Sequence, residues 1–130
     1  MKSRCVKVTA ALPTQLTSMT SARRFVTCAL DTTRLPVEVV DAAVLVASEL
    51  AANATIHGGG LAFRIHVLVD GPRLRIEIDD PSEALPVRTS SPWSGMTIVD
   101  RLCTSWGVAF TATGKRVWCE LATGVPHGVA

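Results

Sequence analysis

The chain has 130 residues, of which 48% are hydrophobic and 18% charged, and its formal net charge is +2 at pH 7. This length suits one domain with its own core, and the composition excludes a disordered tail, a collagen-like repeat and a highly charged nucleic-acid-binding protein. The 13 basic and 11 acidic residues are scattered along the chain, so we expect no direct contact with nucleic acid and none with an anionic membrane.

The first third of the sequence predicts one strand and one helix. Residues Val6–Ala10 alternate in polarity and predict a short strand that ends in a turn. Apolar residues at helical spacing then predict a helix that runs to about Thr32. Ser18 or Thr20 can cap its N-terminus, because a hydroxyl oxygen accepts a hydrogen bond from a free backbone N–H.

A second, longer helix and a β-hairpin are expected next. The helix begins at Pro36 and carries apolar residues every three or four positions until the glycines at 58–60 end it. Two β-rich runs follow, Leu61–Val69 and Arg73–Asp79, and the Asp-Gly-Pro turn between them predicts an antiparallel hairpin.

The last third predicts a loop, a helix and a second hairpin. No periodicity survives from Asp80 to Ser94, where prolines and serines indicate a long loop of the kind that often carries function. Residues Gly95–Ser105 have a helical pattern. The runs Trp106–Ala112 and Lys115–Ala122 predict a closing hairpin.

This order predicts an α/β fold. We expect a two-layer sandwich in which a mixed, mostly antiparallel sheet is covered by three helices on one face. Residues 1–122 form a single domain, and residues 123–130 are expected to be a flexible C-terminal tail.

Neither membrane insertion nor secretion is predicted. A membrane span needs about 20 apolar residues, and the apolar stretch that starts at Val37 is interrupted by Glu38, Asp41 and Glu49. The basic N-terminus is followed by no uninterrupted apolar run, unlike a secretory signal. We therefore expect a cytoplasmic protein.

The four cysteines favour reduced thiols over disulfides, because a chain of this length with its own core needs no covalent cross-link. Neither Cys-x-x-Cys nor His-x-x-x-His occurs. The spacing therefore indicates no structural zinc site.

Three polar residues recur one helical turn apart in the long helix. Glu49 and Asn53 share a face, and His57 follows. An amide oxygen of Asn53 can ligate Mg²⁺, and Glu49 can be the base that orients a hydroxyl for attack on a terminal phosphate. The alternative, an ordinary exposed face of an amphipathic helix, stays open.

Two further positions are candidates for ligand binding. Asp80 follows a strand, where it either starts a turn or accepts a hydrogen bond from the exocyclic amine of a purine. Gly95 and Met96 begin a helix whose free N–H groups can hold an anion, although one glycine at this place can also be a simple helix entry.

Four motifs occur in one order, and together they resemble a known family: Ser48–Gly58, Ile78–Val87, Gly95–Val108 and Gly114–Trp118. The family is that of histidine-kinase-like ATPase domains of the anti-sigma-factor serine/threonine kinase type, in the GHKL superfamily. The resemblance is closest to small single-domain actinobacterial versions.

The resemblance implies a Bergerat-type sandwich that binds ATP with Mg²⁺ between the second helix, the loop and the third helix. It also assigns roles: Glu49 the catalytic base, Asn53 the Mg²⁺ ligand, Asp80 the adenine-recognising carboxylate, and His57, Gly95 and Met96 part of the nucleotide site. The implied partners are an anti-anti-sigma protein, which is phosphorylated, and a sigma factor, which is captured. Members often form homodimers.

Three positions differ from the family pattern. Trp93 replaces the first glycine of the turn before the third helix, Ser82 replaces another glycine, and Arg116 replaces a hydroxyl residue and offers a positive charge. They favour a second hypothesis: a non-catalytic adaptor of the same fold, with weakened or lost ATP binding, that acts only through protein–protein contacts.

Overall fold

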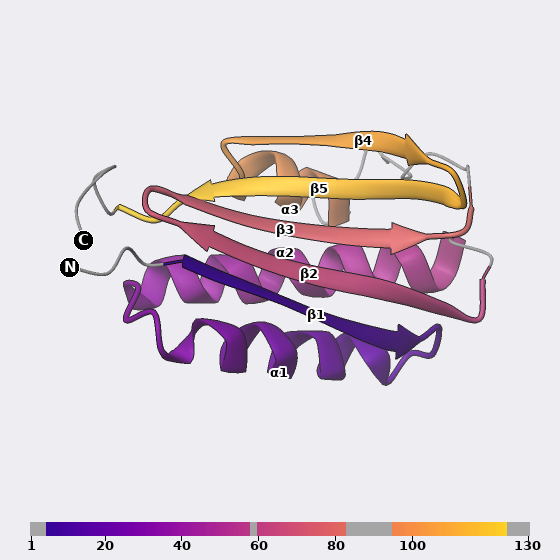
Figure 1. Cartoon of the computed structure of the whole chain (residues 1–130), viewed down its shortest axis with the longest axis horizontal. Helices are drawn as coiled ribbons and strands as arrows, with labels where there is room; N and C mark the ends of the chain where they lie inside the picture. Colours follow the sequence, from indigo (N-terminus) through magenta and orange to yellow (C-terminus); the bar gives the residue numbers. More distant parts are fainter. Residues whose placement is uncertain (1–4, 58–59, 83–94, 125–130) are drawn as a thin grey trace.

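A computed structural model of the chain describes residues 5–57, 60–82 and 95–124. Strands and helices follow one another along the chain as shown in Figure 1. In chain order the elements are β1 (Cys5–Pro13), α1 (Ser18–Asp31), α2 (Val37–His57), β2 (Ala62–Asp70), β3 (Arg73–Asp80), α3 (Gly95–Leu102), β4 (Ser105–Thr111) and β5 (Gly114–Ala122).

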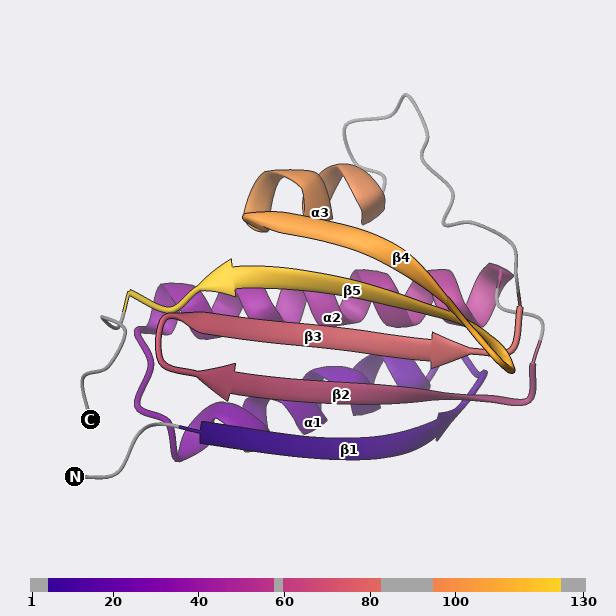
Figure 2. The same ribbon diagram turned by 45° about the horizontal axis from the view of Figure 1, so that its top comes forward.

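The strands form one five-stranded sheet in the order β1-β2-β3-β5-β4. All three helices lie on one side of it, which leaves the other face open (Figures 1 and 2). The predicted two-layer α/β sandwich is therefore confirmed. Every neighbouring pair of described strands is antiparallel, so the sheet is not mixed.

The core lies between the sheet and the helices, and strand alternation builds it. In β2 and β3 every second side chain is apolar and buried. The inward residues of these two strands are Phe63, Ile65, Val67, Val69, Leu74, Ile76 and Ile78. The residues between them face the open side of the sheet, so the alternation predicted for Arg73–Asp79 is confirmed.

Helix α2 is the central helix of the second layer. By length and composition alone, its residues Val37–Ile56 could cross a membrane. Its apolar side chains nevertheless pack into the core, where Ala43, Val46, Ala47 and Leu50 are buried. Packing against the sheet and α1 accounts for the high hydropathy of this helix.

The first strand and helix differ in detail from the prediction. β1 runs from Cys5 to Pro13 because it pairs with β2 along its whole length. Neither Ser18 nor Thr20 caps α1: the N-cap is Thr17, which makes no side-chain cap hydrogen bond. The Ser18 hydroxyl instead donates to the carbonyl of Pro13, 2.5 Å away, and so ties the helix to the end of β1.

The third helix is shorter than the predicted Gly95–Ser105. It ends at Leu102, and the backbone N–H of Thr104 donates to the carbonyl of Glu120 at 2.8 Å. This bond brings the chain alongside β5, so β4 already begins at Ser105. The closing hairpin itself is confirmed.

The structure also describes the first residues of the predicted loop and of the predicted tail. Asp80 is the last residue of β3 rather than the first of a loop, and residues 83–94 of that predicted loop lie outside the described residues. In the predicted tail, Thr123 is buried and donates from its hydroxyl to the carbonyl of Gly71 at 2.7 Å. All four cysteines are free thiols.

Candidate functional site

The polar stripe predicted on the long helix is present on α2. Glu49 and Asn53 lie one turn apart in the helix, and both side chains are half-buried. Ser48 accepts a hydrogen bond from Arg23 of α1 at 2.9 Å, so the neighbouring Glu49 points to a different side of α2. Glu49 and Asn53 therefore share a face that is turned away from the contact with α1.

The chemistry of this pair is suited to catalysis and ligand binding. Burial raises the pKa of the Glu49 carboxyl, which brings it closer to the range in which a carboxylate acts as a general base. Among the described residues, none hydrogen-bonds to the Asn53 side chain, so its amide oxygen is available to a ligand. His57 ends α2.

The Asn53 amide fits a Mg²⁺ site that is shared with phosphates. Such a site commonly takes only one or two protein oxygens, with water and phosphate oxygens as the other ligands. Within residues 5–57, 60–82 and 95–124, no three His, Cys, Asp or Glu side chains cluster as a metal site would require. An amide ligand from α2 is consistent with an ion that the nucleotide carries.

Asp80 is buried at the end of β3 and forms an ion pair that the sequence reasoning missed. Its Oδ1 lies 2.9 Å from the Nζ of Lys115 on β5, and the two side chains are 2% and 4% exposed, respectively. The backbone N–H of Ser82 donates to the same oxygen at 2.8 Å. The carboxylate that was predicted to recognise adenine is therefore buried and already paired with an ammonium group.

The predicted phosphate-binding turn is described only in part. Gly95 is the first residue of α3, and Met96 is 1% exposed, with its side chain in the core. Only the backbone of Met96 is thus left for a ligand. Trp93 lies outside the described residues.

Arg116 does not point toward this region, in contrast to the prediction that it offers a positive charge there. It alternates with the inward-facing Lys115 on β5 and lies on the open face of the sheet. Its Nε and Nη2 donate to the two carboxylate oxygens of Asp79 at 2.6 and 2.9 Å. The guanidinium is thus held by β3 and not presented to a nucleotide.

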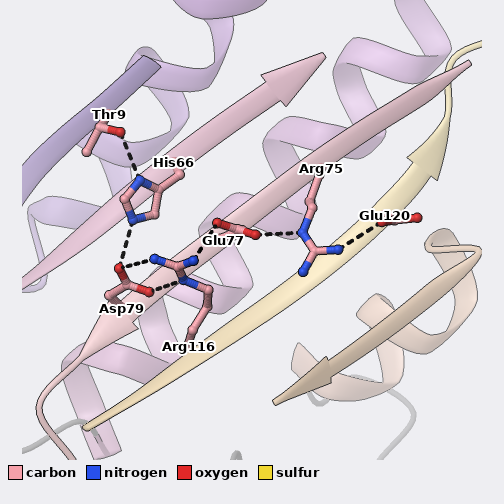
Figure 3. A network of polar contacts seen from close by, with 7 residues as sticks. All are labelled: Thr9, His66, Arg75, Glu77, Asp79, Arg116 and Glu120. Carbon is pink, nitrogen blue, oxygen red and sulfur yellow. Dashed lines mark hydrogen bonds and ion pairs between the residues drawn. The ribbon is translucent and has the colours of Figure 1, made fainter. Parts of the chain in front are cut away.

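A polar network extends over the open face and was not predicted (Figure 3). It links four strands through the side chains of Thr9, His66, Asp79, Arg116, Glu77, Arg75 and Glu120. His66 connects β1 with β3: its Nδ1 lies 2.8 Å from the Thr9 hydroxyl, and its Nε2 lies 2.9 Å from the Asp79 carboxylate. Arg75 also lies over the ring of Trp118, 4.3 Å from its centroid.

Asp79 is the centre of this network. Burial raises the pKa of its carboxyl, but the hydrogen bonds and charges of Arg116 and His66 lower it more, so the pKa of Asp79 lies below its usual value. A depressed carboxyl pKa stabilises the fold above the pKa of the unfolded chain, and this contribution is lost as the pH falls through the folded value.

Asp79→Asn is therefore expected to lower the free energy of unfolding by about 1–2 kcal/mol at pH 7, the order of a charge-assisted hydrogen bond at a partly exposed site. The difference from the wild type should shrink as the pH falls below about 4. Urea unfolding from pH 7 to pH 3 measures it. A difference that stays constant over this range would show that the charge of Asp79 does not stabilise the fold.

A hollow of about 560 Å³ lies at the same end of the sheet as Asp80. Its lining comes from the strands and the β4–β5 turn: Ala11, Ala62, Phe63, Arg64, Asp79, Asp80, Pro81 and Thr113. Among the described side chains that line it, none comes from α2.

Comparison with known proteins gives a family and a fold. Residues 12–113 match the family described as the histidine kinase-like ATPase domain. Among solved structures, the chain is similar to that of the RsbU and RsbW domains of Rv1364c from Mycobacterium tuberculosis, with a TM-score of 0.72 and 14% identity. The match covers 95% of this chain and 34% of that one, so the chain spans about a third of its length. No curated protein matches the sequence.

Proposed function

The chain belongs to the family of histidine kinase-like ATPase domains, and we propose that it binds ATP with Mg²⁺ and phosphorylates a serine or threonine of a partner protein. The observation that carries this proposal is the pair on α2: a half-buried carboxyl of raised pKa one helical turn from an amide without a hydrogen bond to any described residue. In-line phosphoryl transfer uses a group that orients the attacking hydroxyl and an oxygen ligand that helps to hold Mg²⁺, and this pair offers both.

Each polar group of the site has a distinct role in the proposed reaction. The Asn53 amide oxygen ligates Mg²⁺, which supplies neutralisation of the phosphate charge when it is bound. Glu49 accepts the proton of the attacking hydroxyl. Asp80 accepts a hydrogen bond from the adenine amine, while the backbone at Gly95 and Met96 faces the phosphates.

The proposed partners follow from the anti-sigma kinase type of this family. The acceptor of the phosphoryl group is an anti-anti-sigma protein, and the same chain captures a sigma factor and thereby controls transcription. The likeness to a structure that contains an RsbW domain supports this type. We further propose that the protein acts in the cytoplasm, without direct nucleic-acid or membrane contact, that His57 lies beside the nucleotide, and that the chain can form a homodimer.

Asn53→Ala is expected to abolish ATP binding that depends on Mg²⁺, because the substitution removes the amide oxygen that is proposed to ligate the ion. Isothermal titration with ATP, with and without Mg²⁺, measures the effect. Glu38→Ala is the matched control, since Glu38 is exposed in the first turn of the same helix. Wild-type protein that gives no heat with ATP would overturn the proposal, as would unchanged binding by Asn53→Ala.

A second candidate function is the non-catalytic adaptor, which captures its protein partners without nucleotide. The buried ion pair favours it, because the carboxylate assigned to adenine already has an ammonium partner. Two titrations separate the candidates. The kinase binds ATP, whereas the adaptor binds its protein partner equally well with and without ATP.

A further inference from the structure

The ion pair between Asp80 and Lys115 is built into the sheet. The two residues are direct cross-strand partners of the antiparallel pair β3–β5, and both side chains point into the helix-covered side. The Nζ of Lys115 lies 2.9 Å from Oδ1 of Asp80 and 3.3 Å from the carbonyl oxygen of Ser82. The ammonium is thus held at two points and is fixed relative to the carboxylate.

The two oxygens of the Asp80 carboxylate are not equivalent. Oδ1 accepts hydrogen bonds from both the Lys115 ammonium and the Ser82 backbone N–H. An ionised carboxylate offers about two acceptor positions on each oxygen, so Oδ1 is fully used. Within the part of the chain that the structure describes, nothing donates to Oδ2.

A carboxylate with one available oxygen distinguishes between purines. Adenine presents a single amine donor at its pairing edge, beside a ring nitrogen that accepts. Guanine presents two parallel donors, a ring N–H and an amine, and a carboxylate satisfies both only when it uses both oxygens. When one of these oxygens is already saturated, one guanine donor loses its partner, and an unpaired buried donor is costly.

We propose that Lys115 is a positioning residue that sets base specificity: by saturating Oδ1 of Asp80, it leaves one acceptor and so selects adenine over guanine. This inference rests on the proposed function, in which Asp80 faces the base. Lys115 acts through Asp80 and needs no contact with the nucleotide. If the ion pair had only a structural role, its removal would change the Kd values for ATP and GTP by the same factor.

The test is titration of the full chain with ATP and with GTP in the presence of Mg²⁺, for the wild type and for Lys115→Met. The wild type is expected to prefer ATP. In Lys115→Met the ratio of the GTP Kd to the ATP Kd should fall about tenfold, the size of one hydrogen bond. Lys7→Met is the control, because Lys7 is exposed on β1 and its loss should leave the ratio unchanged.

Lys115→Met leaves a buried carboxylate without its ammonium, so a second variant covers the case in which it does not fold. Asp80→Asn/Lys115→Met removes both charges and places an amide, which can donate, beside the base; its preference for ATP should be lost. Wild-type protein that binds neither nucleotide overturns the proposed function and this inference together. If the wild type prefers ATP and the folded variants show the same ratio of the GTP Kd to the ATP Kd, only the role of Lys115 is overturned. Equal binding of ATP and GTP by the wild type also overturns only that role.

Discussion

Glu49→Gln is expected to slow phosphoryl transfer about 10²–10⁴-fold, the usual contribution of a positioned general base. The amide of glutamine has nearly the same size as the carboxyl but cannot accept the proton of the attacking hydroxyl. ATP binding should remain, because the proposed oxygen ligand is Asn53. Single-turnover transfer of the labelled terminal phosphate from ATP to the anti-anti-sigma partner measures the rate, and titration with ATP measures binding.

The pH profile gives a second readout of Glu49. Because burial raises its pKa, the wild-type rate should rise with pH through a value above the ordinary glutamate pKa, and Glu49→Gln should lack this rise. A raised carboxyl pKa favours the folded state below the pKa of the unfolded chain, and this contribution is lost as the pH rises through the folded value. The variant should therefore be no less stable than the wild type at pH 7.

Glu38→Gln is the matched control for both measurements, since Glu38 lies on the same helix and is exposed. It should transfer phosphate at the wild-type rate. Equal losses in the two variants would contradict the assignment of Glu49 as the base. Parallel loss of ATP binding in Glu49→Gln would instead make it a binding residue.

Gly114→Ala is expected to cause a large loss of stability, about 3 kcal/mol or more, from steric overlap and backbone strain together. Gly114 begins β5 with a φ of +156°. A Cβ atom there would overlap the carbonyl oxygen of Asp80 and lie 2.6 Å from the Cα of Pro81. Both obstacles are backbone atoms of the adjoining strand end, so no side-chain rotation relieves the overlap.

Gly124→Ala provides the comparison, because Gly124 also has a positive φ, +80°, but no atom lies within 4 Å of the added Cβ. Only the backbone strain of the positive φ acts there, so we expect the free energy of unfolding to fall by about 1 kcal/mol. Urea unfolding of both variants measures the difference. Similar losses would show that the strand end at Asp80 and Pro81 yields to the extra methyl group.

Much of the fold follows from local patterns in the sequence. The spacing of apolar residues marks all three helices, and alternation marks the strands of both hairpins. The third helix was predicted too long because residues 103–105 keep a helical pattern, while the hydrogen bond from Thr104 to Glu120 draws this segment toward β5. A pairing with a residue 16 positions later leaves no mark in the local pattern.

The candidate site was predictable only where its residues share one element. Glu49 and Asn53 are neighbours on one helix, so their spacing alone places them together. Lys115 is 35 residues from Asp80, and only the register of β3 with β5 joins them. The sequence did contain a signal. Side chains alternate along a strand, so Lys115, two residues before Val117, and Asp80, two residues after Ile78, were both expected on the buried face.

Ion pairs join the end of β3 to β5 on both faces of the sheet. Asp79 opposes Arg116 on the open face, and the next pair, Asp80 with Lys115, closes the buried face. If β5 slipped by one residue against β3, Arg116 would turn from the open face toward the core and Lys115 would leave the core, so both ion pairs would break. These consecutive charge pairs therefore act as a register lock, and homologous chains that lose one partner should also lose the other.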